Sequence, residues 1–222
     1  MMAEKDVEIA DVLLSFLEYK VVFQEPIFEG WDRLGGLTLA IFRAFREWDV
    51  NLENIHGKQA PSNASEIQLA VDLFNSNARF NVGLGAASLF VTNLNWSQAD
   101  IIAKVARVGI EAIQSATNAE IDKQLLTLAI HLKPQSCSVH DITARFTNPQ
   151  AGLIISGAVR AYGMAVYLEN NSWVVDTSSL YPDALFIKLD RTFEAESSFE
   201  TLASTIQRDE NSVLAFLGLR ID

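Results

Sequence analysis

The chain has 222 residues, of which 49% are hydrophobic and 20% are charged, and its formal net charge is −11. This length is enough for one large domain or two small ones to bury a core. The composition excludes a disordered chain, which would be less apolar and more charged. The 17 basic residues are scattered without a run of Lys or Arg. We therefore expect neither nucleic-acid binding, which needs clustered positive charge, nor attachment to an anionic membrane surface.

The cellular compartment follows from the same numbers. The single cysteine, Cys137, cannot form an internal disulfide, so nothing ties the fold to an oxidising compartment. Residues 1–20 open with acidic side chains and lack the basic start of a signal peptide. No apolar run reaches the roughly 18 residues of a membrane span. We expect an acidic, soluble, cytoplasmic protein.

The first third of the chain mixes helical and extended patterns. Residues 5–18 are apolar on more than one side, which is compatible with a short helix, and residues 19–23 favour a strand that ends before Pro26. An apolar stripe at three- to four-residue spacing predicts a helix over 31–48. Gly35 and Gly36 weaken its first turn, so the predicted start lies nearer Leu37.

The middle of the chain carries the clearest periodicities. A short strand around Ile55 interrupts a turn-rich stretch, and period-two alternation then predicts an antiparallel meander with strands over 66–74, 78–84 and 87–94. A helix is predicted over 97–116, with Ser97 as its N-cap. Alternating residues predict a buried strand over 125–132, closed by Pro134.

The last third is richer in strands. Residues 152–169 are predicted to form two strands around a bend, and Asn170 with Asn171 marks a tight turn into a further strand. Another strand is predicted over 184–189 and a helix over 196–208. The apolar stretch 211–219 fits a helix or a strand.

This order of elements predicts an α+β fold, mainly antiparallel sheet with helices packed on one face. Pro134–Ser138 is the best boundary between two strand-rich halves. Residues 1–135 form the first half, with helix, strand, helix, three-strand meander, helix and strand. Residues 136–222 form a strand-rich second half with a C-terminal helix.

A family resemblance rests on the order of these elements. Val21–Phe23, the helix after Asn95–Ser97 and the strand 125–132 are arranged like the first part of a sporadically distributed family of bacterial proteins of unknown function. Residues 184–189 and the following helix resemble its C-terminal part, and the segment 5–18 departs from its pattern. The resemblance implies no known activity and transfers no catalytic residues.

Two short motifs invite a chemical interpretation. Gly83 and Gly85 follow a strand like a phosphate-binding loop, but such a loop needs a helix directly after it, and a strand is predicted there instead. A hairpin glycine pair is therefore favoured. Cys137, His140 and Asp141 could form a nucleophilic set or ligate a metal, but ordinary loop and helix-capping roles are favoured over both.

The remaining polar and aromatic candidates also favour structural roles. His131 is expected to be a hydrogen-bonded histidine within a strand and His56 to be exposed to solvent. The acidic group near Pro26 is expected to be a solvated loop, although paired carboxylates can do acid–base work or bind Mg²⁺. Its members are Glu25, Glu29 and Asp32. The four tryptophans are expected in the core, with interface anchoring as the alternative. They are Trp31, Trp48, Trp96 and Trp173.

No catalytic, cofactor or metal motif emerges, so the sequence favours a non-enzyme. The leading hypothesis is a protein-interaction or assembly module that forms a homo-oligomer. A mean hydropathy of +0.14 in a chain without a membrane segment suits apolar surface that is buried against another protein. An open sheet edge would suit pairing with a further strand. The alternative is a small-ligand-binding domain with a pocket between sheet and helices, served by glycines 83, 85, 157 and 163. The third is an unfamiliar enzyme that combines His140 and Asp141 with carboxylates of segment 25–32.

Overall fold

A computed structural model describes residues 7–58, 68–93, 96–144 and 163–221. The fold is α+β, as predicted: ten strands form one mainly antiparallel sheet with helices packed against it. The strand order is β2-β3-β4-β5-β1-β6-β9-β8-β7, and β10 pairs with β1. The β1–β10 pair is parallel, and the other pairs with a described register are antiparallel.

The strands and helices are as follows. The strands are β1 (Glu8–Phe23), β2 (Ile55–Lys58), β3 (Gln68–Leu73), β4 (Ala78–Gly83), β5 (Ala86–Thr92), β6 (Ile121–Pro134), β7 (Gly163–Leu168), β8 (Asn171–Thr177), β9 (Leu185–Glu194) and β10 (Leu219–Ile221). The α-helices are α1 (Phe28–Asp32), α2 (Leu34–Phe45), α3 (Ala99–Thr117), α4 (Val139–Thr143) and α6 (Phe199–Leu217). Short 3₁₀ turns are η1 (Arg46–Trp48), η2 (Leu52–Asn54) and η4 (Trp96–Gln98).

The chain divides into two compact units. The meander unit comprises Phe16–Thr127 and Thr192–Ser204. The hairpin unit comprises Met1–Ser15, Leu128–Arg191 and Thr205–Asp222. Each unit is built from stretches that are distant in the sequence.

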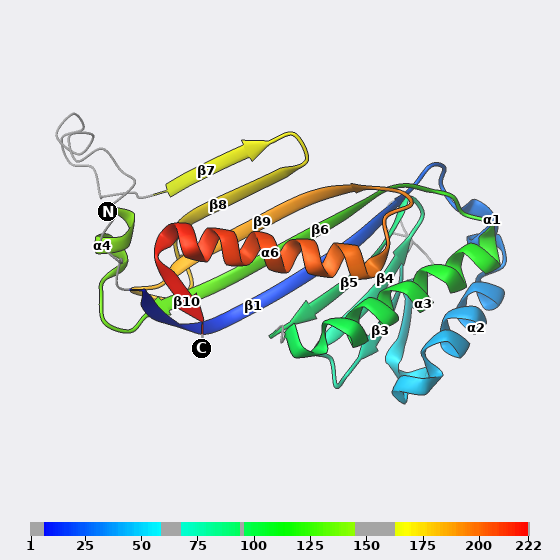
Figure 1. Cartoon of the computed structure of the whole chain (residues 1–222). Coiled ribbons are helices and arrows are strands. Elements are labelled where there is room, and N and C mark those ends of the chain that lie inside the picture. The colour runs from blue at the N-terminus through cyan, green and yellow to red at the C-terminus, as the bar shows by residue number, and fades with distance from the viewer. Residues whose placement is uncertain (1–6, 59–67, 94–95, 145–162, 222) are drawn as a thin grey trace. The chain divides into compact units, whose positions relative to one another are not determined.

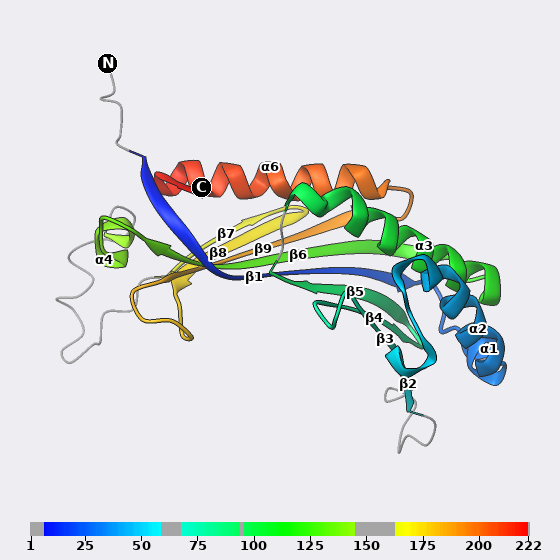
Figure 2. The same cartoon turned by 90° about the horizontal axis from the view of Figure 1, so that it is seen from below.

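The meander unit packs α2 and α3 against one face of β3, β4 and β5 (Figures 1 and 2). Alternate residues of these strands are buried on that face, which is the period-two pattern of a half-covered sheet. Phe80 of β4 meets Phe45 of α2 edge to face, with ring centroids 5.1 Å apart. Gly109 of α3 lies against both rings, and its missing side chain allows this close approach.

The hairpin unit packs the last two-thirds of α6 against β8 and β9 (Figure 1). Val175, Ile187 and Leu189 are buried there. Asp209 of α6 accepts a hydrogen bond from Nε of Arg191 at 2.7 Å. A strand end is thus tied to the helix by a charged pair that is largely shielded from water, because the two side chains are 22% and 12% exposed.

The predicted helix over 5–18 is wrong, because this segment forms the first part of the 16-residue strand β1. From Ser15 to Phe23 every second side chain is buried. Before Ser15, apolar side chains point to both faces of the strand: Val12 is 42% exposed and Leu13 36%. A strand with apolar residues on both faces has no period-two signal, so its sequence resembles a buried helix.

The predicted starts of two helices need correction. α2 begins at Leu34 rather than near Leu37, so Gly35 and Gly36 lie inside its first turn. Gln98, and not Ser97, is the N-cap residue of α3, and it makes no capping hydrogen bond with its side chain. The segment around Ser97 forms the turn η4 instead.

The other predicted elements agree with the structure. The meander, the short strand at Ile55 and the strand that ends at Pro134 are confirmed. The segment 211–219 continues α6 to Leu217 before β10 begins. Residues 152–162 lie outside the described residues, and the end of the predicted strand pair 152–169 is β7.

The packing around Gly109 predicts opposite effects for two Gly→Ala substitutions in the meander unit. A Cβ at Gly109 would lie 2.7 Å from the Phe80 ring and 2.8 Å from the Phe45 ring, and both rings are fully buried. G109A should lower the free energy of unfolding by about 1–3 kcal/mol, although alanine favours a helix by about 1 kcal/mol.

G35A is the matched control, because a Cβ at Gly35 meets nothing within 4 Å. It should raise the free energy of unfolding by about 0.5–1 kcal/mol. Urea unfolding followed by circular dichroism measures both changes. A G109A protein as stable as the unmodified chain would contradict close packing at this position.

Candidate functional site

The outer edge of β7 is the most distinctive surface feature of the hairpin unit. β7 ends the strand order, and within the part of the chain that the structure describes no strand pairs with its outer side. Its sequence, Gly-Met-Ala-Val-Tyr-Leu, carries no charge. Leu168 pairs with Asn171 across a two-residue turn. The two strand residues that flank such a turn form a hydrogen-bonded pair. The backbone groups of Met164, Val166 and Leu168 therefore form hydrogen bonds with β8. The residues between them point their backbone N–H and C=O groups outward.

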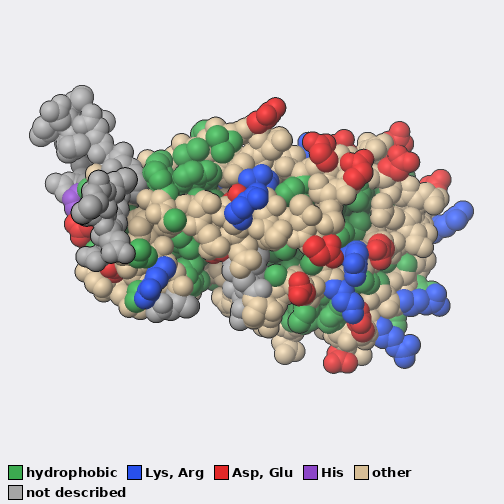
Figure 3. All heavy atoms as spheres, in the orientation of Figure 1, with side chains coloured by type: hydrophobic (Ala, Val, Ile, Leu, Met, Phe, Trp, Pro, Cys, Tyr) green, Lys and Arg blue, Asp and Glu red, His purple; other side chains and the backbone are tan. Residues whose placement is uncertain are grey.

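An apolar strip lies beside this edge, on the face that α6 covers further inward. Met164 and Val166 pair with Val175 and Trp173 of β8 and are half-buried. Leu168 is 61% exposed. Trp173 packs edge to face on Phe216 of α6 at 5.6 Å, and Phe216 is itself 46% exposed. Figure 3 shows hydrophobic side chains gathered over β7 and β8.

The strand at the other end of the order, β2, differs from β7. It has only four residues, and His56 and Lys58 are two of them. Short edge strands with charged residues resist pairing with other chains, whereas an uncharged apolar edge invites it. Of these two end strands in the described part of the chain, β7 has the character of a pairing surface and β2 does not.

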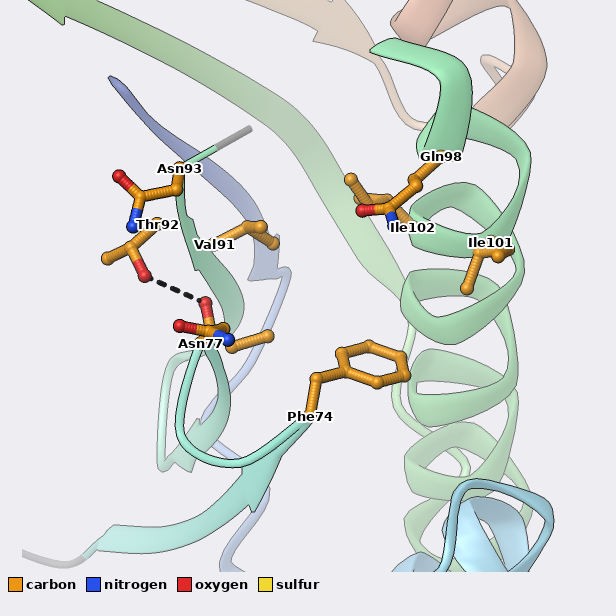
Figure 4. Close-up of a pocket in the computed structure, with 9 residues that line it drawn as sticks. Phe74, Asn77, Val91, Thr92, Asn93, Gln98, Ile101 and Ile102 are labelled. Carbon is orange, nitrogen blue, oxygen red and sulfur yellow. Dashed lines mark hydrogen bonds between the residues drawn. The ribbon is translucent and has the colours of Figure 1, made fainter. Parts of the chain in front are cut away.

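A second feature is a cavity of about 350 Å³ in the meander unit (Figure 4). Ile101 and Ile102 of α3 form one wall, and Val91 with Ala78 forms the opposite one. The rim is completed by Phe74 and by uncharged polar residues, and none of the described lining residues is charged. These polar residues are Asn77, Thr92, Asn93 and Gln98.

The turn from β3 to β4 shapes this cavity. Phe74, Asn75 and Ser76 all adopt positive φ, at 53°, 54° and 68°. A bulky residue in the left-handed region is strained by about 1–3 kcal/mol. This backbone directs the Phe74 ring toward α3 across the opening (Figure 4). Thr92 stabilises the turn by donating from both N and Oγ1 to the carbonyl of Asn77, at 2.9 and 3.1 Å.

The two short motifs are structural features. Gly83 and Gly85 belong to the β4–β5 hairpin, as predicted, and neither lines the cavity. Ser138 caps α4: its Oγ accepts from the Asp141 N–H at 3.1 Å, and the Asp141 carboxylate accepts from the Ser138 N–H at 3.0 Å. The predicted capping role of the region is confirmed. Cys137 is half-buried and His140 is exposed.

His131 is a hydrogen-bonded strand histidine, as predicted. It is 3% exposed, and its Nδ1 lies 2.8 Å from Ser178 Oγ. That oxygen accepts N–H groups from Leu180 and Tyr181, so its own proton is directed to Nδ1 and the neutral ring carries its proton on Nε2. Both lone pairs of Oγ are engaged. Ser178 is therefore built as a turn cap and not as a nucleophile.

His56 is exposed, as predicted, and belongs to a charged cluster on the open face of the meander. Its Nε2 lies 3.0 Å from Asp72, which also accepts a hydrogen bond from Arg79 Nε at 2.7 Å. The hydrogen bond from Arg79 is the main cause that holds the pKa of Asp72 below its usual value. The cluster joins β2, β3 and β4, and its exposed partners make it a surface network.

The acidic group near Pro26 is exposed to solvent, as predicted, but the predicted loop is wrong in part, because Glu29 and Asp32 lie in α1. It lies in the meander unit, whereas His140 and Asp141 lie in the hairpin unit. Among the described residues, no three His, Cys, Asp or Glu side chains are grouped so that they could hold a metal ion. Trp31, Trp48 and Trp173 are half-buried, and the side chain of Trp96 lies outside the described residues.

One buried polar cluster has no counterpart among the predicted candidates. Tyr19 donates to Gln124 Oε1 at 2.7 Å, and Gln124 Nε2 donates to the carbonyls of Glu194, Ala195 and Ser197. Burial raises the pKa of Tyr19 far above its usual value. Every polar side-chain atom of Gln124 is satisfied within the protein, so the cluster ties the loop before α6 to β6 and serves the fold.

Comparison with known proteins adds no function. The chain matches no protein-family model and no curated protein. The family resemblance inferred from element order stays a prediction. None of the described helices is long and apolar enough to cross a membrane.

The burial of His131 predicts a pH-dependent stability. Desolvation lowers the pKa of His131 below its usual 6.5. As the pH falls, the unfolded chain is therefore protonated at His131 before the folded protein is. The contribution of His131 to the free energy of unfolding is fully present above pH 6.5 and is lost as the pH drops through the folded pKa. The slope for this residue approaches at most about 1.4 kcal/mol per pH unit.

H131N retains a hydrogen-bond acceptor for Ser178 but does not titrate in this range. Urea unfolding at intervals from pH 7.5 to 5.5 should show a smaller loss of stability for H131N than for the unmodified chain. Equal pH slopes for the two proteins would refute the assignment.

Proposed function

We propose that this protein is a non-enzymatic interaction and assembly module that associates through the outer edge of β7. The single observation that carries the proposal is an uncharged six-residue edge strand with exposed apolar side chains, Tyr167 at 77% and Leu168 at 61%. A further strand added to such an edge gains main-chain hydrogen bonds and buries apolar side chains together.

The absence of charge on β7 permits a second copy as the partner. Each chain carries a net charge of −11, so two copies repel one another over most of their surfaces. An interface between them needs a region without like charges, and β7 is such a region. A basic partner, in contrast, would be drawn to acidic surface, and β7 offers it none.

Light scattering coupled to size exclusion tests this function. The unmodified chain should have a mass above the monomer value of 24.6 kDa. A165P should return the mass to 24.6 kDa, because it removes an outward-pointing N–H and places a ring at the edge. The fold should tolerate this change, since the N–H of Ala165 makes no bond to β8.

Leu52 provides the control position. It is 71% exposed in η2 of the meander unit, and L52K should leave the mass unchanged. Circular dichroism should give the same spectrum for all three proteins. A monomeric unmodified chain, or an assembly that A165P does not affect, would rule out the β7 edge.

A second candidate function, small-ligand binding, is favoured by the cavity beside α3. Its volume of about 350 Å³ falls at the lower end of the range of small-molecule sites. Apolar walls with an uncharged polar rim suit a neutral molecule that has an apolar body and one or two hydrogen-bonding groups. The strain held at Phe74 supports this candidate, because strained residues cluster at binding sites.

The neutral fluorescent probe N-phenyl-1-naphthylamine tests the cavity. Its fluorescence should rise on saturable binding to the unmodified chain. I101E places a charge in the wall and should weaken binding at least about tenfold, a change of about 1.4 kcal/mol.

L39E is the matched control on α2, since Leu39 is 45% exposed and Ile101 is 46% exposed. It should change binding less than about twofold, which is within about 0.4 kcal/mol. Unsaturable binding, or equal losses for the two variants, would argue against a ligand site in this cavity.

A further inference from the structure

We infer that two copies pair antiparallel through β7 about a two-fold axis that passes beside Val166, and that this contact closes a dimer. The inference rests on the proposed function and adds the partner and the register. It follows from the pleat of β7, the direction of its backbone groups and the order of its side chains.

The pleat limits the registers that are allowed. Met164, Val166 and Leu168 share the α6 face, because their β8 partners include the buried Val175 and the Trp173 that contacts Phe216. Residues that face each other in an antiparallel pair point to the same side of the sheet. A two-fold axis must therefore pass beside a residue, and not between two residues.

The α6-face side chains select Val166 as that residue. With Val166 on the axis, Val166 faces its own copy and Met164 faces Leu168 of the second copy. All three apolar side chains of this face then gain an apolar cross-strand neighbour, including Leu168, which is 61% exposed in the single chain. With Ala165 on the axis, Leu168 would extend beyond the partner's described strand.

The backbone groups fit the same register. Ala165 and Tyr167 direct their N–H and C=O groups away from β8. In this register Ala165 of one copy faces Tyr167 of the other, so the two residues exchange both hydrogen bonds. On the face away from α6, the small alanine leaves room for the tyrosine ring, which is 77% exposed in the single chain.

The geometry also explains why assembly stops at two copies. A two-fold contact uses the same edge of both chains, so no β7 edge remains. Pairing of β7 with β2 would instead leave one free end at each step and produce a growing chain. The four residues of β2, with His56 and Lys58 among them, oppose that alternative.

Disulfide trapping tests the register, in a C137S background that removes the only native cysteine. V166C should form a covalent dimer within minutes under mild oxidation by copper phenanthroline. The two Cβ atoms form a non-hydrogen-bonded pair about 4.5 Å apart, within reach of a disulfide. M164C and L168C should each form no covalent dimer alone but should cross-link when the two proteins are mixed.

Y167C is the matched control. Tyr167 is more exposed than Val166, so random collisions would cross-link Y167C faster than V166C. The proposed dimer predicts the reverse, with V166C cross-linking at least about tenfold faster than Y167C. Equal or reversed rates would overturn the register. If A165P dissolves an assembly in which V166C does not cross-link, the register fails and the proposed function stands; if the unmodified chain is monomeric at all concentrations, both fail.

Discussion

The structure depends on the hydrogen-bonding requirement of an open sheet. Each strand has backbone groups on two sides, and the interior strands of the order satisfy both sides with neighbours. The strands at the ends, β2 and β7, satisfy one side within the described chain. β2 is short and contains His56 and Lys58, whereas β7 has neither a charge nor a proline to discourage a further strand. This difference between the two ends separates a protected edge from a usable one.

The rest of the hairpin unit supports that edge. α6 buries Val175, Ile187 and Leu189 on the inner strands, and Arg191 holds the helix through Asp209. Toward β7, α6 no longer covers the sheet completely, and the half-buried Trp173 and the exposed Phe216 mark the margin of the covered area. A second β7 strand would extend the sheet beside this margin and remove more apolar surface from water.

The sequence predicted the fold class because alternation is strong wherever one face of a strand is covered. Ile67–Leu73 carries that signal, and β3 appears where it occurs. It failed for the first part of β1, where apolar residues on both faces hide the period of two. The start of α3 was misplaced because Ser97 has the residue type of an N-cap but does not border the α-helix. It lies within the 3₁₀ turn η4, which precedes α3.

The candidate sites were harder to predict than the fold. An open edge was expected, but which strand provides it depends on the order of strands, and sequence patterns contain no such order. The cavity was missed because its Phe74 lies in a turn recognised only through Asn75–Asn77. Gln124 was missed because it lies before the predicted strand 125–132, and only tertiary structure brings together the three carbonyls that satisfy it.

Hydrogen exchange of individual β7 amides, followed by NMR at several protein concentrations, tests the central claim most directly. The Val166 amide should exchange slowly at every concentration, because it bonds to β8. The Ala165 and Tyr167 amides should exchange fast in dilute solution and slowly in concentrated solution, as a second strand covers them. Fast exchange of Ala165 and Tyr167 at all concentrations, in a protein that nevertheless associates, would contradict pairing through the β7 edge.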